Sequence, residues 1–582
     1  MNKETLKEMF NFTKNKKETI IIGIILVVQL ILYTFSYPFI MQKVVDEAIP
    51  EENIGLVILL SVILIIIVVI RFLTNRYSEI RRKNCCYDNN EEIKNKIFKS
   101  IQESKVSELD KIQAGNLFEI FGKQAMEASY LFVWNFVGIV SVRLALTIAI
   151  SIILLVLNLK LGLIVLGIFV VSYLILVPFY VKTIKIYRNL QKIVIDLQGN
   201  INEYIEAYST TKTLKLEEIN LSQINEILDK CKKEMIKSSK IIEIHNSLFS
   251  LLTFNAVILI LIIGGNELSL GIGLSSTIML MIDYVDDINR HLKSLLEHVH
   301  GLNNRYNCFL NILKISKIEK EENQGTKKLE NIKTIEFKEV SLSYDNLNTI
   351  LDKISFHIDK PKQIAIVGKS GAGKTSLVNL LPRFYDIYNG EILINGIDYK
   401  KYKLEELRNK IAYVFQEPVI FEKTIIENIR FGNKDDISEE QIKEVCRKIG
   451  LDDKIMQLPN AYDTVISSKT DLLSYGEKQL LSFARAILKN ADLVILDEVT
   501  SNLDLEFEEF IMKATKEILN NKISFVIAHR LNTIKNADLI IFIENKKIVE
   551  MGTHEELIEK HEYYYDLYMS KEQLFTTESY SL

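Results

Sequence analysis

The chain has 582 residues, which is too long for one ordinary domain and indicates two to four. Its hydrophobic fraction of 48% is high for a water-soluble enzyme. Its formal net charge of −4 excludes a global basic field of the kind that binds nucleic acid, so no nucleic-acid partner is expected. The average conceals two halves, since long apolar runs fill the first half and short apolar segments alternate with helical patterns in the second.

Six apolar stretches in the first half are each long enough to cross a membrane. A transmembrane helix needs about 20 apolar residues to cross ~30 Å of hydrocarbon. Six such stretches in succession could hardly be buried in a soluble core. The sequence therefore predicts insertion in a lipid bilayer through residues near 18–41, 55–73, 131–157, 161–181, 247–266 and 270–292.

The connecting segments predict the orientation of these spans. Lysine and arginine concentrate in the N-terminal residues and in two long helical excursions, residues 74–130 and 182–246. The opposite side has an acidic loop at residues 42–54 and predicted turns at 158–160 and 264–267. Positive loops remain in the cytosol. We therefore expect a multi-pass protein of the cell membrane with a cytoplasmic N-terminus and second half, and the Lys-, Ile- and Asn-rich composition suggests a bacterial source.

The run GKSGAGKT at residues 368–375 predicts a phosphate-binding loop. It follows a buried-strand pattern at residues 363–367 and precedes a helical pattern. Lys374 is expected to reach the β- and γ-phosphates of ATP, and the Thr375 hydroxyl to hold Mg²⁺. Backbone N–H groups of the loop would surround the phosphates. The predicted nucleotide-binding residues of this loop are Gly368, Lys369, Ser370, Gly371, Ala372, Gly373, Lys374, Thr375 and Ser376.

A second apolar strand pattern, from residue 491 onward, ends in Asp497 and Glu498. Beside a P-loop, Asp497 suits binding of Mg²⁺, either directly or through a water molecule that the ion holds. Glu498 lies where a general base could polarise the water that attacks ATP. The sequence thus predicts a nucleoside triphosphatase.

With these motifs the chain resembles the ATP-binding cassette (ABC) transporters, specifically half-transporters. The resemblance implies a six-helix all-α transmembrane domain followed by an α/β P-loop NTPase domain. LSYGEKQ, at residues 473–479, is similar to the family signature, which implies that Ser474 and Gly476 contact the γ-phosphate held by an opposite subunit. The resemblance further implies adenine stacking for Tyr344, contact with Mg²⁺ and water for Gln416, an acid of the dimer-interface loop for Asp504 and a switch histidine for His529.

The resemblance also sets domain boundaries and coupling segments. We expect the transmembrane domain at residues 1–316, a polar linker at 317–333, the nucleotide-binding domain at 334–570 and a tail at 571–582. Residues 113–117, and Glu203 with residues 212–216, resemble the two cytosolic segments that couple such domains.

Two departures from the family pattern leave the subunit composition open. Tyr475 and Glu477 stand where glycine and glutamine are most common, and residues 467–470 lack the usual acid. A homodimer is favoured, and a heterodimer with a second half-transporter is the alternative. The expected function is ATP-driven alternating access that exports an amphiphile such as a peptide, lipid or drug, whose identity the sequence does not give. An importer and a non-transporting ATP-gated regulator or channel remain alternatives.

The sixth apolar stretch is interrupted by charges. Asp283, Asp286, Asp287 and Arg290 recur at helical spacing and share one face. Charges inside spans are costly, so they suggest either a cavity wall that attracts cationic cargo or an ion-pair stripe in a hydrated vestibule, of which we favour the second. Arg143, in the third span, could partner one of these acids.

Overall fold

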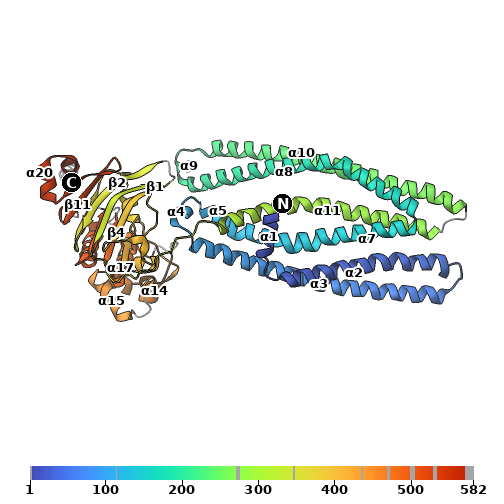
Figure 1. Cartoon of the computed structure of the whole chain (residues 1–582), viewed down its shortest axis with the longest axis horizontal. Coiled ribbons are helices and arrows are strands. Elements are labelled where there is room, and N and C mark those ends of the chain that lie inside the picture. The colour runs from blue at the N-terminus through green and yellow to red at the C-terminus, as the bar shows by residue number, and fades with distance from the viewer. Residues whose placement is uncertain are drawn as a thin grey trace. The chain divides into compact units, whose positions relative to one another are not determined.

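The computed structural model (Figure 1) describes residues 3–570 apart from 113, 271–274, 345–347, 434–436, 468–471, 499–504 and 528–533. The chain divides into two compact units. The helical unit comprises Met1–Gln102 and Ile112–Ile318, and the sheet unit comprises Glu103–Lys111 and Glu319–Leu582. The short segment Glu103–Lys111 therefore leaves the helical part of the sequence and packs with the sheet unit.

Long helices, packed side by side in pairs, make up the helical unit. Their apolar residues recur on several faces, as expected of helices that contact lipid as well as each other. In Figure 1, α2 (Lys16–Lys43) lies beside α3 (Ile54–Gln102), α8 (Leu159–Glu206) beside α10 (Glu217–Ser269), and α7 (Ser141–Leu157) beside α11 (Ser275–Ser316).

Shorter helical segments connect these pairs. The stretch before α7 is helical from residue 114 onward but includes π-helical turns, which are typical of strained or functional positions. The short segments are α1 (Lys3–Asn11), η1 (Val44–Ala48), α5 (Ala114–Glu119), η2 (Ile120–Gln124), α6 (Ala125–Tyr130), η3 (Leu131–Val140) and α9 (Tyr208–Thr213).

Five helical stretches among the described residues are long and apolar enough to cross a membrane. They contain the first five predicted spans. α11 contains most of the sixth predicted span and has sufficient length, but its acidic residues make it less apolar than the others. The five stretches are Lys16–Ala48, Ile54–Gln102, Gly115–Leu157, Leu159–Ile186 and Glu217–Ser269.

The predicted turn at 158–160 is confirmed, whereas the predicted turn at 264–267 is wrong. Asn158 caps α8, because its side-chain oxygen accepts a hydrogen bond from the Leu161 N–H at 3.1 Å. Residues 264–267, in contrast, belong to the helix α10, which continues to Ser269. Gly264 serves close packing instead, since a Cβ there would lie 3.0 Å from the side chain of Ile278 in α11.

The charged face of α11 forms ion pairs within its own helix. Arg290 contacts Asp286 at 3.4 Å and also pairs with Asp287. These contacts favour the ion-pair stripe over the cargo site. Arg143 of α7 lies 2.8 Å from Nδ1 of His291, so the contact found for this arginine is to a histidine of α11 and not to one of the acids.

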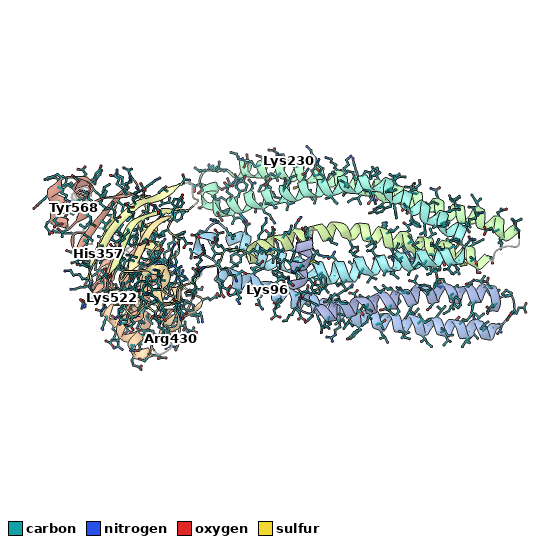
Figure 2. All side chains as sticks on the ribbon, viewed as in Figure 1. Lys96, Lys230, His357, Arg430, Lys522 and Tyr568 are labelled. Carbon is teal, nitrogen blue, oxygen red and sulfur yellow. The ribbon has the colours of Figure 1, made fainter. Side chains whose placement is uncertain are left out.

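The cytosolic excursions predicted from the sequence are helical over most of their length, with breaks after Gln102 and after Glu206. α3 and α10 each continue well beyond their apolar windows as single helices with interleaved charged residues. Lys230, for example, lies on the exposed side of α10 (Figure 2) and pairs with Glu226 one turn away at 2.7 Å. Polar pairs of this kind stabilise a helix in water, so these extensions suit the aqueous side of a membrane.

The sheet unit contains, in its described residues, a six-stranded sheet of order β12-β11-β3-β10-β9-β6 and a four-stranded antiparallel sheet of order β2-β1-β4-β5. In the larger sheet all neighbouring strands are parallel except β12, which pairs antiparallel with β11. The strands are β1 (Ile335–Ser343), β2 (Thr349–Ile358), β3 (Gln363–Val367), β4 (Asn389–Ile394), β5 (Ile397–Asp398), β6 (Ile411–Val414), β7 (Lys423–Thr424), β8 (Val465–Ile466), β9 (Leu493–Asp497), β10 (Ile523–Ile527), β11 (Leu539–Glu544) and β12 (Lys547–Gly552).

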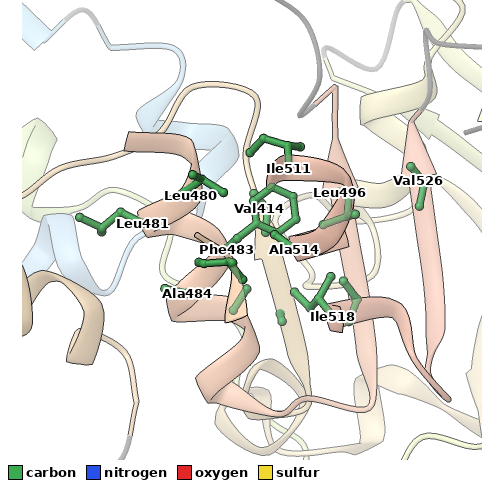
Figure 3. Packing of buried hydrophobic residues seen from close by; sticks show 14 of the residues in the cluster. Val414, Leu480, Leu481, Phe483, Ala484, Leu496, Ile511, Ala514, Ile518 and Val526 are labelled. Carbon is green, nitrogen blue, oxygen red and sulfur yellow. The ribbon is translucent and has the colours of Figure 1, made fainter. Parts of the chain in front are cut away.

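Helices cover the larger sheet, and buried apolar side chains fill the space between. The central strands are continuous apolar runs, as expected of parallel strands that are covered on both faces. Figure 3 shows side chains of α17 and α18 packed toward Val414, Leu496 and Val526 of the sheet. The helices of the unit are α4 (Val106–Leu109), α12 (Lys374–Asn379), η4 (Tyr399–Lys401), α13 (Leu404–Asn409), α14 (Ile425–Arg430), α15 (Glu439–Lys448), α16 (Asp452–Met456), η5 (Ala461–Asp463), α17 (Tyr475–Lys489), α18 (Leu505–Leu519) and α20 (His554–Lys560).

The residues expected to form a linker are fixed on the sheet unit from Glu319 onward. Both carboxylate oxygens of Glu321 accept from the Arg408 guanidinium, at 2.9 and 2.6 Å. Gly325 packs directly against the backbone of Tyr402, since a Cβ on Gly325 would lie 1.9 Å from the backbone oxygen of Tyr402. This segment is therefore held by a bidentate ion pair and by close backbone packing, and it does not behave as a loose tether.

Candidate active site

Parallel strands place the predicted chemical groups at one edge of the larger sheet. β10 lies between β3 and β9 and is parallel to both, so the C-terminal ends of all three strands lie together. β3 continues into the P-loop, and β9 ends at Asp497. Ligands of open α/β sheets bind outside the C-terminal ends of the strands. The edge formed by these three strands is therefore the candidate active site.

The P-loop adopts a backbone that requires glycine at more than one position. Gly371 and Gly373 have φ angles of +79° and +98°, in the left-handed region that side chains rarely adopt. A Cβ at Gly373 would also lie 2.9 Å from the side chain of Leu351. α12 begins at Lys374 directly after this turn, so backbone N–H groups at its start are available to an anion.

Lys374 is buried within the loop, at 6% exposure. Its Nζ donates to the backbone oxygens of Gly368 and Lys369, both at 3.1 Å. Burial lowers the pKa of Lys374 below its ordinary value of 10.5. The ammonium is thus already inside the loop, and among the described residues its hydrogen-bond partners are carbonyl oxygens that phosphate oxygens could replace.

Asp497 lies beside Thr375, and their oxygens suit a hard cation. The Thr375 hydroxyl donates to Oδ1 of Asp497 at 3.3 Å. The hydroxyl of Tyr413 lies 3.4 Å from Oδ2 and 2.8 Å from the side-chain oxygen of Asn379. Burial raises the pKa of Asp497 above its ordinary value of 3.8. A buried carboxylate beside a threonine hydroxyl fits Mg²⁺, which binds proteins through few carboxylates and completes its shell with water and phosphate.

Glu498 follows Asp497 in a left-handed backbone conformation, with a φ of +46°. Such a conformation is uncommon for glutamate and is found more often at active sites. Oε2 of Glu498 accepts a hydrogen bond from the side-chain amide of Gln416 at 3.0 Å. The structure thereby brings together the expected general base and the residue expected to contact water.

Tyr344 lies next to the P-loop, as its expected role requires. Its hydroxyl donates to the Ser376 hydroxyl at 2.8 Å, and its ring centroid lies 4.7 Å from that of Tyr385. The ring is exposed at 42%, so one surface remains open to a flat partner such as adenine.

Ser474 and Glu477 form a capping box at the start of α17. The Ser474 oxygen accepts from the Glu477 N–H at 3.3 Å, and the Glu477 carboxylate accepts from the Ser474 N–H at 2.7 Å. Lys454 neutralises this buried carboxylate at 3.2 Å. Gly476 has no room for a side chain, since a Cβ would lie 2.8 Å from the ring of Phe507. Glu477 therefore caps the signature helix, a role that the common glutamine could also fill.

Some predicted positions lie outside the described residues. Asp504 and His529 are among them, as are residue 113 of the first coupling segment and residues 468–470 of the altered stretch before the signature. β10 ends at Ile527, two residues before His529, at the same edge of the sheet as Asp497. The expectations for Asp504 and His529 remain predictions.

Sequence reasoning missed the contacts of Glu103–Lys111 with the rest of the sheet unit. Lys105 of this segment contacts Glu319 at 2.7 Å and Asp386 at 2.9 Å. Tyr385, which packs on Tyr344, also donates its hydroxyl to Asp110. The segment lies just before residues 113–117, within the charged excursion predicted at residues 74–130. Its sequence pattern does not distinguish the charged residues that contact the sheet unit from those that face water.

The fold and the site together define the class of protein. A P-loop follows the central strand of a parallel sheet, and a neighbouring strand ends in an Asp-Glu pair. The same chain carries five helices of membrane-spanning length and composition in its described residues. It is a membrane-embedded protein with a P-loop nucleotide-binding unit.

Comparison with known proteins identifies the family. Residues 20–284 match the family model described as ABC transporter transmembrane region, and residues 351–501 match the model described as ABC transporter. The ABC transporter ATP-binding protein YfiC of Bacillus subtilis is 30% identical over 588 residues, covering 98% of this chain and 94% of YfiC. The chain therefore belongs to the ABC transporter family, and it is an ATPase that drives transport across a membrane.

Other similar proteins agree with this assignment. YgaD of Bacillus subtilis, whose name describes a multidrug export ATP-binding/permease protein, is 28% identical and covers 97% of this chain and 98% of its own. An ATP-dependent lipid A-core flippase of Desulfotalea psychrophila is 34% identical over 67% of this chain and 69% of its own. The solved structure of a bacterial Atm1-family ABC exporter with ATP bound has the same fold, with a TM-score of 0.82 at 20% identity over 95% of this chain and 98% of that chain.

Proposed function

We propose that this protein exports an amphiphilic substrate across a bacterial cell membrane as a homodimer of half-transporters. The observation that carries the proposal is the convergence of Lys374, Thr375, Asp497, Gln416 and Glu498 at one sheet edge in a chain that also spans the membrane. The relatives named for multidrug export and for lipid A-core flipping support the direction and an amphiphilic cargo. ATP binding and hydrolysis would then expose a substrate cavity alternately to the two sides of the membrane.

The residues of the site have distinct roles in hydrolysis. The P-loop amides and Lys374 would bind the phosphates, and Tyr344 would stack on adenine. Thr375, Asp497 and Gln416 would hold Mg²⁺, which supplies charge neutralisation to the phosphate oxygens when it is bound. Glu498 would accept a proton from the attacking water while the Gln416 amide holds its carboxylate in place.

The signature explains why two copies are needed. The Ser474 oxygen already accepts from the Glu477 N–H, so its hydroxyl proton is available to an external acceptor. Ser474 is exposed at the N-terminus of a 15-residue helix, where the dipole favours anions. The γ-phosphate of an ATP bound to a second copy is an anion and could also accept the Ser474 hydroxyl proton. ATP would thus join two copies, and hydrolysis would release them.

Transport by reconstituted protein tests the proposal. Copies in liposomes whose sheet unit faces outward respond to added ATP, so we expect a fluorescent phospholipid to accumulate in the inner leaflet or a hydrophobic cationic dye to accumulate in the lumen. The matched control is the same liposomes with ATP and no Mg²⁺. ATP-dependent depletion of the lumen would instead identify an importer. Hydrolysis that moves neither probe would favour the ATP-gated regulator or channel.

The pH dependence of ATP hydrolysis should show the loss of the proton from the Lys374 ammonium. Because burial lowers its pKa below 10.5 in the free protein, the ammonium loses its charge as the pH rises through that lowered value. We therefore expect kcat/KM for ATP to fall on the alkaline side at a pH below 10.5. In Lys374→Arg the guanidinium stays charged, so the alkaline fall should disappear even if the variant is slower overall. An unchanged alkaline limb in Lys374→Arg would exclude Lys374 as the titrating group.

A further inference from the structure

Tyr475, the residue that replaces the common glycine of the signature, contacts the loop that carries Gln416. It is the first residue of α17, and its hydroxyl donates to the backbone oxygen of Gln416 at 2.7 Å. One turn further on, the fully buried Gln479 donates its side-chain amide to the backbone oxygen of Phe415 at 3.2 Å. α17 therefore holds two successive carbonyl groups of this loop.

These two bonds hold the start of the loop, and Asn428 and Arg485 hold its later part. β6 ends at Val414 and β7 begins at Lys423, so the residues between have no strand partners in the described structure. The Phe415 ring stacks on Tyr413, with centroids 4.2 Å apart, which fixes the start of the loop. The Gln416 side chain then reaches Oε2 of Glu498 at 3.0 Å. A continuous series of hydrogen bonds thus leads from Tyr475 through Gln416 to Glu498.

The Tyr475 hydroxyl is suited to this contact. Partial burial raises its pKa above the ordinary value of 10.0, so it stays protonated and able to donate at neutral pH. Glycine at this position could not make the bond. The ring is 36% exposed, so it is not a core residue whose loss would unfold the helix.

We propose that Tyr475 is a positioning residue that holds Gln416 against Glu498 and so raises the rate of ATP hydrolysis at the site of its own chain. This inference rests on the proposed function. It gives Tyr475 a different role from its neighbours Ser474 and Gly476, which would act on the nucleotide of the opposite copy. Tyr475 would therefore link the signature turn of one ATP site to the catalytic groups of the other.

Tyr475→Phe removes the hydroxyl and keeps the ring. Losing one hydrogen bond that positions the base should lower kcat about three- to ten-fold, with KM for ATP and the melting temperature unchanged. Tyr402→Phe is the matched control, because it also removes a tyrosine hydroxyl that donates to a backbone oxygen, that of Ile394 at 3.1 Å, away from the site. The control should hydrolyse ATP at the wild-type rate.

A double-mutant cycle with Gln416→Ala tests whether Tyr475 acts through Gln416. In that background Tyr475→Phe should cause no further loss. An equal loss in both backgrounds would overturn the proposal, as would wild-type kcat in Tyr475→Phe. A raised KM with unchanged kcat would also overturn it and indicate a contact with nucleotide.

Mixed dimers separate the two sites. When one of two differently tagged copies carries Glu498→Gln, only the site with the intact Glu498 turns over. Tyr475→Phe should slow hydrolysis when it shares a chain with the intact Glu498, and a loss confined to the opposite chain would overturn the proposal. Failure of the proposed function looks different, because a protein that does not export would hydrolyse ATP without moving either probe, and a protein that is not a homodimer would not form the mixed dimers.

Discussion

Replacing Glu498 by glutamine should lower steady-state ATP hydrolysis by about 100-fold or more while ATP binding persists, since a positioned general base contributes ~10²–10⁴ to the rate. The amide oxygen of glutamine can still accept the hydrogen bond that Gln416 donates to Glu498, so the loop should keep its position. What disappears is the carboxylate that takes a proton from water. Phosphate release measures the expected loss of hydrolysis, and equilibrium nucleotide binding on the same preparation measures whether ATP still binds.

The control for this variant is Glu509→Gln. Glu509 is an exposed carboxylate on α18 that pairs with Lys513 at 2.8 Å, so its neutralisation should leave turnover unchanged. Turnover in Glu498→Gln within about threefold of wild type would remove Glu498 from the role of base, whatever the control shows.

Replacing Lys374 by alanine should weaken ATP binding by about 100-fold, because charge-assisted contacts to two phosphates are lost from a buried site. The protein should stay folded. Burial already disfavours the charge of Lys374, and the hydrogen bonds of its ammonium within the described part of the chain go to two backbone oxygens. Calorimetric titration with ATP and Mg²⁺, together with a thermal melt, separates loss of affinity from loss of structure.

Lys547→Ala provides the comparison. Lys547, on β12, is exposed and pairs with Asp352 at 3.2 Å, so its loss removes the same charge from the same unit and leaves every residue of the P-loop in place. Its ATP affinity should match wild type. Equal affinities for Lys374→Ala and Lys547→Ala would mean that this loop is not the phosphate site.

The parts of the site that could be predicted from the sequence are those formed by short motifs of consecutive residues. The P-loop needs glycine at Gly371 and Gly373 for its backbone, and an apolar strand must precede it, so the pattern itself encodes the geometry. Asp497 and Glu498 were predictable for the same reason, because they end a continuous apolar run. The fold class followed from these motifs and from the length of the apolar stretches, and the comparisons confirm it.

Contacts between distant segments could not be predicted. The bond from Tyr475 to Gln416 joins residues 59 positions apart and depends on how an irregular loop returns to α17. Placement of Glu103–Lys111 on the sheet unit likewise depends on folding, since the helical pattern of a charged excursion does not indicate which partner a segment of it contacts.

The wrong turn at residues 264–267 has a different cause. Two glycines usually mark a turn in water, but a membrane helix tolerates them, because its backbone hydrogen bonds have no competition from solvent. Gly264 then allows α10 to approach Ile278 of α11 closely. Composition alone could not distinguish these two uses of glycine.

ATP hydrolysis by this protein should require two copies of the chain in one membrane. The ATPase rate of the full-length protein in lipid nanodiscs, sorted by the number of copies they hold, is the measurement that decides this. Discs with two copies should hydrolyse ATP, and discs with one copy should bind ATP without sustained turnover. Equal rates per copy in both kinds of disc would contradict the account.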